Sequence, residues 1–167
     1  GWKEIHGCAN RGQFDLKQHI EHSKQNLEVF DENTQKKVIP RVIEPSQGVG
    51  RAFLSFMFEA YDDDKKRGNV VLKLHPSLAP YKVGVFPLVN KLNDRSRKVF
   101  EKLKQEFVCF FDKSGSIGRR YARADEIGIP YCITIDFESI EDRSVTIRDR
   151  DTTAQKRLEI TKLPKLL

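Results

Sequence analysis

The chain has 167 residues, of which 38% are hydrophobic and 32% charged, and its formal net charge is +6. This length and composition suit one full-sized domain, or a small domain with part of another, and exclude collagen-like, low-complexity and disordered chains. No apolar run approaches the roughly 18 residues of a membrane span. The first residues also lack the pattern of a signal peptide. We therefore expect no membrane association.

The three cysteines are far apart in the sequence and form no Cys-x-x-Cys motif. They are typical of reduced thiols in a cytoplasmic protein rather than of a disulfide framework or a zinc site, and we expect no metal site. Residues 1–75 carry 12 basic and 11 acidic side chains, whereas residues 76–167 carry 18 and 13. The second part is the better candidate for binding a polyanion, with an ordinary solvated basic surface as the alternative.

The first part of the chain mixes short alternating segments with helical periodicity. The expected elements are a strand at Trp2–Cys8, a helix at Asp15–Lys24, a strand at Val38–Glu44 and a largely buried helix at Ala52–Tyr61. A charged turn and two prolines follow between residues 62 and 80. Because such residues interrupt regular structure, we place one domain at 1–77 and a second at 78–167.

The second part of the chain alternates between strand and helix patterns. The expected strands are Tyr81–Leu88, Val108–Asp112, Tyr131–Phe137 and Ser144–Arg148, and the expected helices are Asp94–Phe107, Ser116–Ile127 and Thr152–Leu163. This order indicates a mixed sheet between helices, that is, a three-layer α/β domain.

A motif at residues 44–51, Glu-Pro-Ser-Gln-Gly-Val-Gly-Arg, joins a strand to a helix. Glu44 and Ser46 are two residues apart and project from one strand face, where they can hold a small ammonium group. The glycines let the backbone approach a ligand, and Arg51 suits a phosphate oxygen. The alternative is a turn whose arginine pairs with a nearby carboxylate, because Gly-x-Gly alone is a weak signal.

Two further motifs lie in the basic second part. Residues 114–121, Ser-Gly-Ser-Ile-Gly-Arg-Arg-Tyr, open a helix whose free N–H groups and arginines can grip a phosphate. Residues 148–151, Arg-Asp-Arg-Asp, offer arginine donors and aspartate acceptors to the edges of unpaired bases. The alternatives are ordinary helix capping with solvated arginines for the first motif and a salt-bridged turn for the second.

Together these motifs resemble the carboxyl-terminal part of glycyl-tRNA synthetases, class II aminoacyl-tRNA synthetases of the homodimeric type. The resemblance rests on Gly1-Trp2-x-Glu4-x-x-Gly7-x-Ala9-Asn10-Arg11-x-x-Phe14-Asp15-Leu16 and on Val42 to Arg51 as class II motif 3. It rests further on Leu78-Ala79-Pro80-Tyr81-Lys82, on Ser114 to Pro130, on Thr134-Ile135-Asp136-Phe137 and on Arg148 to Asp151. It implies the end of an antiparallel-sheet catalytic domain followed by an α/β anticodon-binding domain.

The resemblance also implies a reaction and its participants. The family joins glycine to its tRNA through a glycyl-adenylate, with ATP and Mg²⁺, and acts as a homodimer. Glu44 and Ser46 match the residues that hold glycine, and Arg51 matches the catalytic arginine of motif 3. The segment that binds ATP is matched by Gly48, Gly50 and Arg51, with Glu4 as a further carboxylate. Contacts to the tRNA are assigned to Arg119, Arg120, Arg148 and Arg150, the last two as base readers.

Class II motifs 1 and 2 have no counterpart in the chain, so we expect a fragment that is inactive alone. The sequence leaves open whether the missing segment is a separate chain, which residue reads which base, and the oligomeric state. The alternative to the enzyme is a non-catalytic binding subunit of the same fold, such as an accessory subunit of a polymerase. The presence of Glu44, Ser46 and Arg51 favours the enzyme, because a binding subunit has no use for them.

Overall fold

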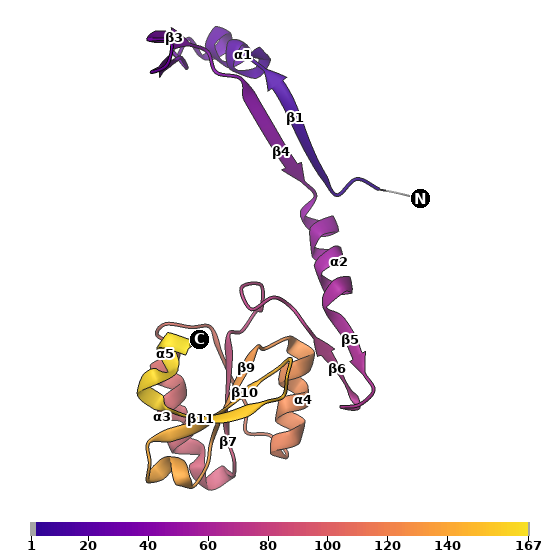
Figure 1. Cartoon of the computed structure of the whole chain (residues 1–167), viewed down its shortest axis with the longest axis vertical. Helices are drawn as coiled ribbons and strands as arrows, with labels where there is room; N and C mark the ends of the chain where they lie inside the picture. Colours follow the sequence, from indigo (N-terminus) through magenta and orange to yellow (C-terminus); the bar gives the residue numbers. More distant parts are fainter. Residues whose placement is uncertain (1–2, 167) are drawn as a thin grey trace. The chain divides into compact units, whose positions relative to one another are not determined.

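The computed structural model describes residues 3–166 (Figure 1). Its contacts divide the chain into two compact units, 1–55 and 56–167. The division falls within helix α2 (Val49–Ala60), earlier than the boundary expected between residues 77 and 78. It comes earlier because a hairpin over residues 61–72 packs on the second unit. The assignment of 1–77 and 78–167 to two domains stays a prediction.

The first unit is built on an antiparallel pair of strands, β1 (His6–Gly12) and β4 (Val42–Gln47). Helix α1 (Phe14–Ser23) follows β1, and a small hairpin of β2 (Val29–Asp31) and β3 (Lys36–Val38) precedes β4. The strand expected at Trp2–Cys8 thus begins later, and Trp2 lies outside the described residues.

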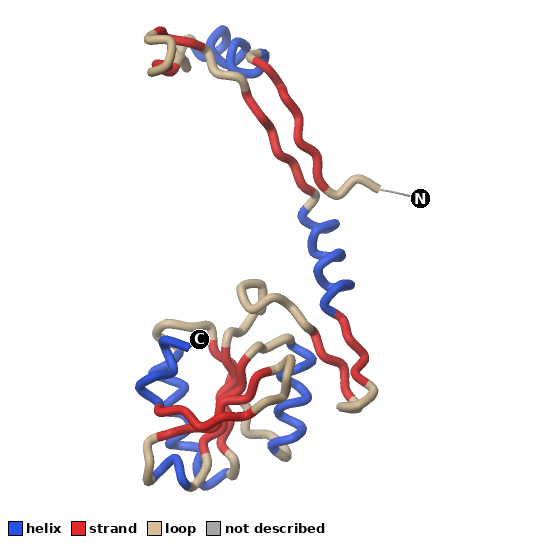
Figure 2. Tube along the Cα trace, viewed as in Figure 1, coloured by secondary structure: helices blue, strands red, loops and turns tan. Residues whose placement is uncertain are grey.

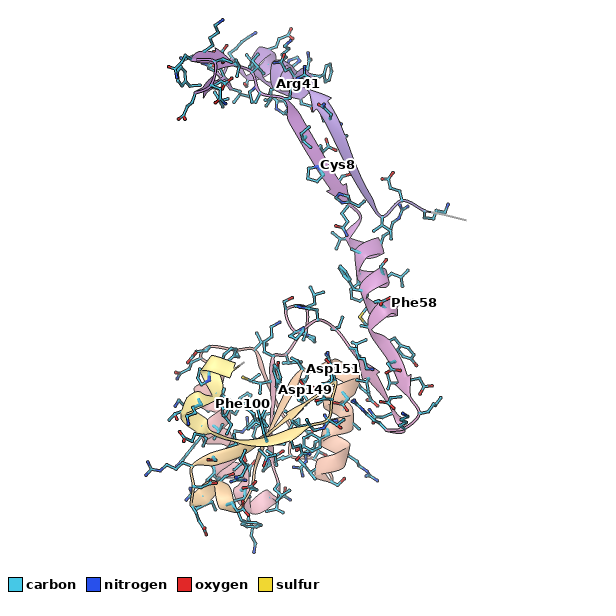
Figure 3. The ribbon with its side chains drawn as sticks, viewed as in Figure 1. Cys8, Arg41, Phe58, Phe100, Asp149 and Asp151 are labelled. Atoms are coloured by element: carbon cyan, nitrogen blue, oxygen red, sulfur yellow. The ribbon has the colours of Figure 1, made fainter. Side chains whose placement is uncertain are left out.

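Helix α2 forms where its periodicity predicts it, but the expectation that it is largely buried is wrong for the described chain. Ala60 is its one buried residue among those described. Phe53, Leu54 and Phe58 are 64%, 67% and 84% exposed, and Phe58 projects from the helix in Figure 3. Its apolar sequence therefore has no matching cover in the described residues.

The second unit contains a five-stranded mixed sheet in the order β11-β10-β9-β7-β8. Figure 2 shows its strands in red with helices beside them. Strand β7 (Val83–Pro87) lies parallel to both β8 (Cys109–Phe111) and β9 (Tyr131–Ile135). Strand β10 (Ser144–Asp149) runs antiparallel to β9 and to β11 (Gln155–Glu159). The expected mixed α/β sheet is confirmed.

Helices cover both faces of this sheet, as the sequence predicts. Helix α3 (Asn93–Leu103) and Leu163, the first residue of α5 (Leu163–Leu166), pack with Val83 and Val85 on one face. Helix α4 (Ile117–Ile127) packs with Phe86 and Cys132 on the other. Alternate residues of β7 thus enter opposite cores, which is the pattern of a strand buried on both faces. No described helix has the length and apolar character needed to cross a membrane.

A hairpin of β5 (Tyr61–Asp64) and β6 (Asn69–Leu72) belongs to the second unit and packs on α4. The contact is close at Gly128, the residue after α4, where φ is +86°. A Cβ there would lie 2.9 Å from the carbonyl oxygen of Leu72, so both backbone angle and space require glycine.

The helix expected at Thr152–Leu163 is wrong. The chain turns at residues 150–154, returns as β11 alongside β10, and becomes helical only at its end. The outward side of an edge strand is free to carry polar residues, so Gln155–Glu159 resembles an exposed helix in composition. The segment is a strand because it pairs with β10, and no local sequence pattern reveals that pairing.

Charged groups are buried between α4 and the sheet. The Arg148 guanidinium donates to both carboxylate oxygens of Asp125, at 2.8 and 3.0 Å, and these side chains are 7% and 2% exposed. The Arg148 guanidinium also lies 4.9 Å from the ring centroid of Tyr121. Breaking such a pair from one side leaves a buried charge without its partner.

We expect Asp125→Asn to destabilise the chain by about 3–5 kcal/mol, because the variant keeps the shape of the side chain but leaves Arg148 uncompensated. The matched control is Glu159→Gln, whose partner Lys162 is 3.0 Å away and exposed, so that its loss should cost less than about 1 kcal/mol. Urea unfolding followed by circular dichroism measures both. Equal losses in the two variants would contradict the assignment.

Candidate functional site

The predicted glycine-binding residues lie on one face of the β1–β4 pair. Ser46 is the cross-strand partner of Gly7, and Glu44 is the partner of Ala9. Cross-strand partners share a sheet face, so the hydroxyl and the carboxylate stand opposite the two smallest side chains.

Two of the predicted residues, Ser46 and Glu4, lie next to Gly7. A Cβ on Gly7 would lie 3.3 Å from Ser46 Oγ and 3.4 Å from Glu4 Oε1. The Arg51 guanidinium donates a hydrogen bond to the backbone carbonyl of Glu4. Glu4 therefore lies next to Gly7 and is bonded to Arg51, Ser46 lies next to the same glycine, and Gly7 is a residue of this region that the sequence analysis did not single out. Its absent side chain is what allows the approach.

Arg11 is a second residue that sequence reasoning did not assign. Its guanidinium lies 3.3 Å from Glu44 Oε2 and also hydrogen-bonds Asp15. The hydrogen bond from Arg11 lowers the pKa of Asp15. A register shift between Asn10 and Gly12, with φ +61° at Gly12, places Arg11 at a bulge. Motif spacing does not reveal such a bulge, so the partner of Glu44 could not be inferred.

The two glycines of this motif flank the start of helix α2. The Gly48 carbonyl accepts the first helical hydrogen bond, from Ala52 N at 2.9 Å. A Cβ on Gly50 would meet open space. The first N–H groups of a helix lack internal partners and attract anions, and Arg51 lies in this turn. The segment can accept a phosphate group.

At the start of α4, residues 112–116 form a turn that exposes the helix N-terminus. Gly115 has φ +70°, and Ser116 Oγ accepts from Arg119 N at 3.4 Å as the helix cap. Asp112 accepts from Ser114 N at 2.7 Å and from Arg123. Although burial opposes it, these interactions lower the pKa of Asp112. The turn is therefore held in a defined shape.

Arg119 and Arg120, predicted together, lie in different environments. Arg119 is exposed, so its guanidinium can meet a phosphate. Arg120 is 3% exposed and donates to the carbonyls of Pro87, Ser114 and Gly115. Arg120 thus ties the turn to the end of β7, and its burial argues against direct contact with tRNA.

Arg148 and Arg150, predicted to read bases, also point into the protein. Arg148 is paired with Asp125, as described above, and Arg150 is 2% exposed. Arg150 donates to the carbonyls of Gly128 and Leu74, at 2.9 and 2.8 Å. The placement favours the alternative of a salt-bridged turn and argues against direct base contact by either arginine.

Arg67, in the turn of the β5–β6 hairpin, completes this arrangement. It donates to the carbonyls of Arg150 and Asp151, at 2.7 and 2.6 Å, and pairs with Asp64 at 3.0 Å. The role of Arg67 could not be predicted from the sequence, because nothing local links this turn to residues that follow it by 83 and 84 positions. Arg67 and Arg150 together hold the hairpin and Leu74, which follows it, against the turn at residues 150–154.

The profile of the family described as "Anticodon binding domain" matches residues 82–167. The chain belongs to this family. The match covers the sheet with its helices α3 and α4, and includes Arg119, Arg120, Arg148 and Arg150.

Curated relatives extend the similarity over the first unit. The "Glycine--tRNA ligase" of Ruminiclostridium cellulolyticum is 52% identical over 98% of this chain and 36% of its own length. Those of Caldanaerobacter subterraneus subsp. tengcongensis and Staphylococcus saprophyticus are 52% and 51% identical over 100% of this chain, which spans 37% of each. The resemblance to glycyl-tRNA synthetases is confirmed, and the chain spans little more than a third of these relatives.

We expect Arg120→Met to loosen the turn before α4, because three carbonyls lose their buried donor. Amide hydrogens of residues 114–118 should then exchange faster, and the free energy of unfolding should fall by about 1–3 kcal/mol. The neighbouring exposed Arg119→Met is the matched control and should change neither. Hydrogen exchange read by mass spectrometry makes the measurement. Equal exchange in the two variants would show that Arg120 does not hold the turn.

Proposed function

We propose that this chain contributes the motif 3 edge of the catalytic site and the anticodon-binding domain of a glycine–tRNA ligase. The observation that carries the proposal is the coincidence of two findings. Relatives named glycine–tRNA ligase match the chain throughout. Ser46 and Glu4 lie next to Gly7, Arg51 donates to the Glu4 carbonyl, and Glu44 shares the strand face of Ser46.

Each residue of this face has a distinct task in the proposed reaction. Glu44 and Ser46 hold the ammonium group of glycine, one by charge and one by hydrogen bonding. Gly7 and Ala9, opposite them, keep the face open, while the nearby carboxylates leave little room for a larger amino acid. Arg51 and the N–H groups at the start of α2 bind the phosphates of ATP.

Mg²⁺ would enter this site with ATP. Magnesium commonly binds through one or two carboxylates together with substrate phosphates, and Glu4, next to Arg51, is a suitable carboxylate. Among residues 3–166, no group of three His, Cys, Asp or Glu side chains could hold a metal by itself. A phosphate-dependent site is consistent with that finding. The ion, when bound, neutralises phosphate charge.

The proposal extends to partners and location. The anticodon-binding domain binds a glycine tRNA, the complete ligase acts as a homodimer, and the reaction takes place in the cytoplasm. The exposed apolar residues of α2 fit a helix covered by other parts of a complete ligase. No finding favours the alternative of a polymerase accessory subunit.

We expect the chain alone to give no glycine-dependent pyrophosphate exchange, since it lacks a counterpart of motif 2 to neutralise the reacting phosphate. Exchange should appear when the amino-terminal part of a relative is supplied, fused or as a separate polypeptide. In that complete system, Arg51→Ala should lower the rate about 10²–10³-fold, and Glu44→Gln should raise the KM for glycine.

The control is Glu21→Gln, an exposed carboxylate on α1, which should leave both parameters unchanged. Robust exchange by the isolated chain would refute this division of roles. So would a complete system in which Arg51→Ala behaves like the control.

For tRNA binding, we expect the chain to prefer a glycine tRNA over the same tRNA with a changed anticodon. Arg119→Ala should weaken binding to both alike and reduce the slope of log K against log salt by about 1, because a phosphate contact releases a counterion. Filter binding over a salt series measures this. If Arg119→Ala changed the anticodon preference but not the salt slope, the proposed contact of Arg119 with a tRNA phosphate would be wrong.

A further inference from the structure

The cations of helix α3 lie on two different flanks of the helix. Residues 95–104 contain five of them, all exposed, namely Arg95, Arg97, Lys98, Lys102 and Lys104. Residues three or four apart are neighbours on a helix surface, so Arg95, Lys98 and Lys102 form one continuous row, which we call the α3 row. Arg97 and Lys104, two turns apart, occupy the flank on the other side of the buried residues of the helix.

The flank of Arg97 and Lys104 is occupied by contacts within the protein. The Arg97 guanidinium lies 4.1 Å from the ring centroid of Phe111. Lys104 Nζ pairs with Glu101 Oε2 at 2.5 Å and lies 5.8 Å from the ring centroid of Phe100, which is labelled in Figure 3. A cation over an aromatic ring is attracted by its π electrons. The two cations of this flank therefore already have partners.

The α3 row has no such partners and is unfavourable for the helix itself. Among the described residues, no carboxylate forms an ion pair with any of its three cations. The helix also carries Asp94 and Glu101, and Glu101 is turned to Lys104. Like charges three and four residues apart repel each other, and Arg95 lies in the first turn, where the helix dipole opposes a cation. A row that costs the helix stability favours an anion from outside the chain.

The topology of the sheet places the first turns of α3 and α4 at the same edge. Strands β7 and β8 are parallel, and α3 follows β7 as α4 follows β8. The two helices cover opposite faces of the sheet (Figure 1). Arg95 in the first turn of α3 and Arg119 in the first turn of α4 therefore lie on either side of the carboxyl ends of these strands.

From this edge the α3 row leads away along the helix. Its first and last cations are separated by roughly 10 Å at the rise of an α-helix. A row of this length fits an extended polyanion better than a single phosphate group. An RNA that meets Arg119 at the edge reaches the far end of the row only with nucleotides further along its backbone.

We propose that the α3 row binds phosphates in the anticodon stem of a glycine tRNA. The proposal rests on the proposed function, in which Arg119 binds a tRNA phosphate on the other side of the same edge. The stem is the part of that RNA which continues away from a bound anticodon loop. Cations in a row replace the counterions of the RNA backbone. Such contacts carry no sequence information, but they fix how the RNA lies on the domain.

The experiment measures filter binding of the whole chain over a salt series. The ligands are a glycine tRNA, its anticodon stem-loop, and the same stem-loop with uncharged methylphosphonate linkages in the stem. The test variant combines Arg95→Gln, Lys98→Gln and Lys102→Gln, because glutamine keeps the helix propensity of these residues. A second variant, with Arg95→Lys, Lys98→Arg and Lys102→Arg, conserves the charge. Circular dichroism establishes that each variant is folded.

Single substitutions provide a matched control on the same helix. Lys98→Gln removes one charge from the α3 row, and Lys104→Gln removes one charge from the opposite flank. The two variants therefore have the same net charge and differ in where the charge is lost.

With the tRNA and the charged stem-loop, the triple glutamine variant should lower the slope of log K against log salt by about 2–3, since each lost phosphate contact releases about one counterion fewer. Lys98→Gln should lower the slope by about 1, whereas Lys104→Gln and the charge-conserving variant should keep the wild-type slope. With the uncharged stem, the triple glutamine variant and the wild type should have the same slope.

The outcomes separate this inference from the proposed function. If the wild type binds no glycine tRNA, the proposed function fails together with the inference. If the wild type binds it and the triple glutamine variant keeps the wild-type slope, the inference is overturned and the function stands. The same holds if that variant loses slope equally on the charged and the uncharged stem, or on the whole tRNA alone, because the phosphates would then lie outside the stem.

The change in the ligand allows a decision even if a variant misfolds. The wild-type slope should be steeper by about 2–3 for the charged stem-loop than for the uncharged one. Equal slopes for the two ligands would overturn the inference.

Discussion

The carboxylate of Asp125 is the point at which the separate parts of the second unit are joined. It lies on α4, accepts both forks of Arg148 from β10, and lies 3.5 Å from Arg67 of the β5–β6 hairpin. With its side chain 2% exposed, its charge has lost most of its hydration and needs these partners. Helix, sheet and hairpin therefore have to be in place together, which makes their association cooperative.

That requirement also explains the division of labour within residues 148–151. Guanidinium groups bring long stems and several donors, so they can cross the interior and satisfy carbonyls of the hairpin and of α4. The short aspartate side chains stay near the surface, where one caps the turn and both remain within reach of solvent. Residues 148–151 thereby expose their carboxylates and bury their guanidinium groups. The net charge of the sequence therefore does not show which charge lies at the surface here.

Much of this architecture could be predicted from the sequence. The strands β7, β8, β9 and β10 and the helices α3 and α4 follow local periodicity, because each is apolar on the side that faces a core. The final strand β11 could not be predicted, since its identity depends on pairing with β10 rather than on its own residues. Glu4, Ser46 and Arg51 were singled out through motifs, whereas the contacts that link them, at Gly7 and at the Glu4 carbonyl, depend on strand pairing that the motifs do not show. Arg11 and Arg67 were missed because a bulge and a long-range contact determine their partners.

The hydrogen bonds from Arg67 to the turn at residues 150–154 limit how this domain can be moved into another protein. The family profile begins at residue 82, yet Arg67, Leu72 and Leu74 lie before it and cover Asp125, Gly128 and Arg150. A graft cut at the profile boundary would expose buried charges and an apolar patch that the recipient could not cover. The structural unit is thus longer than the segment that the family profile matches. A domain moved into another protein has to include the β5–β6 hairpin.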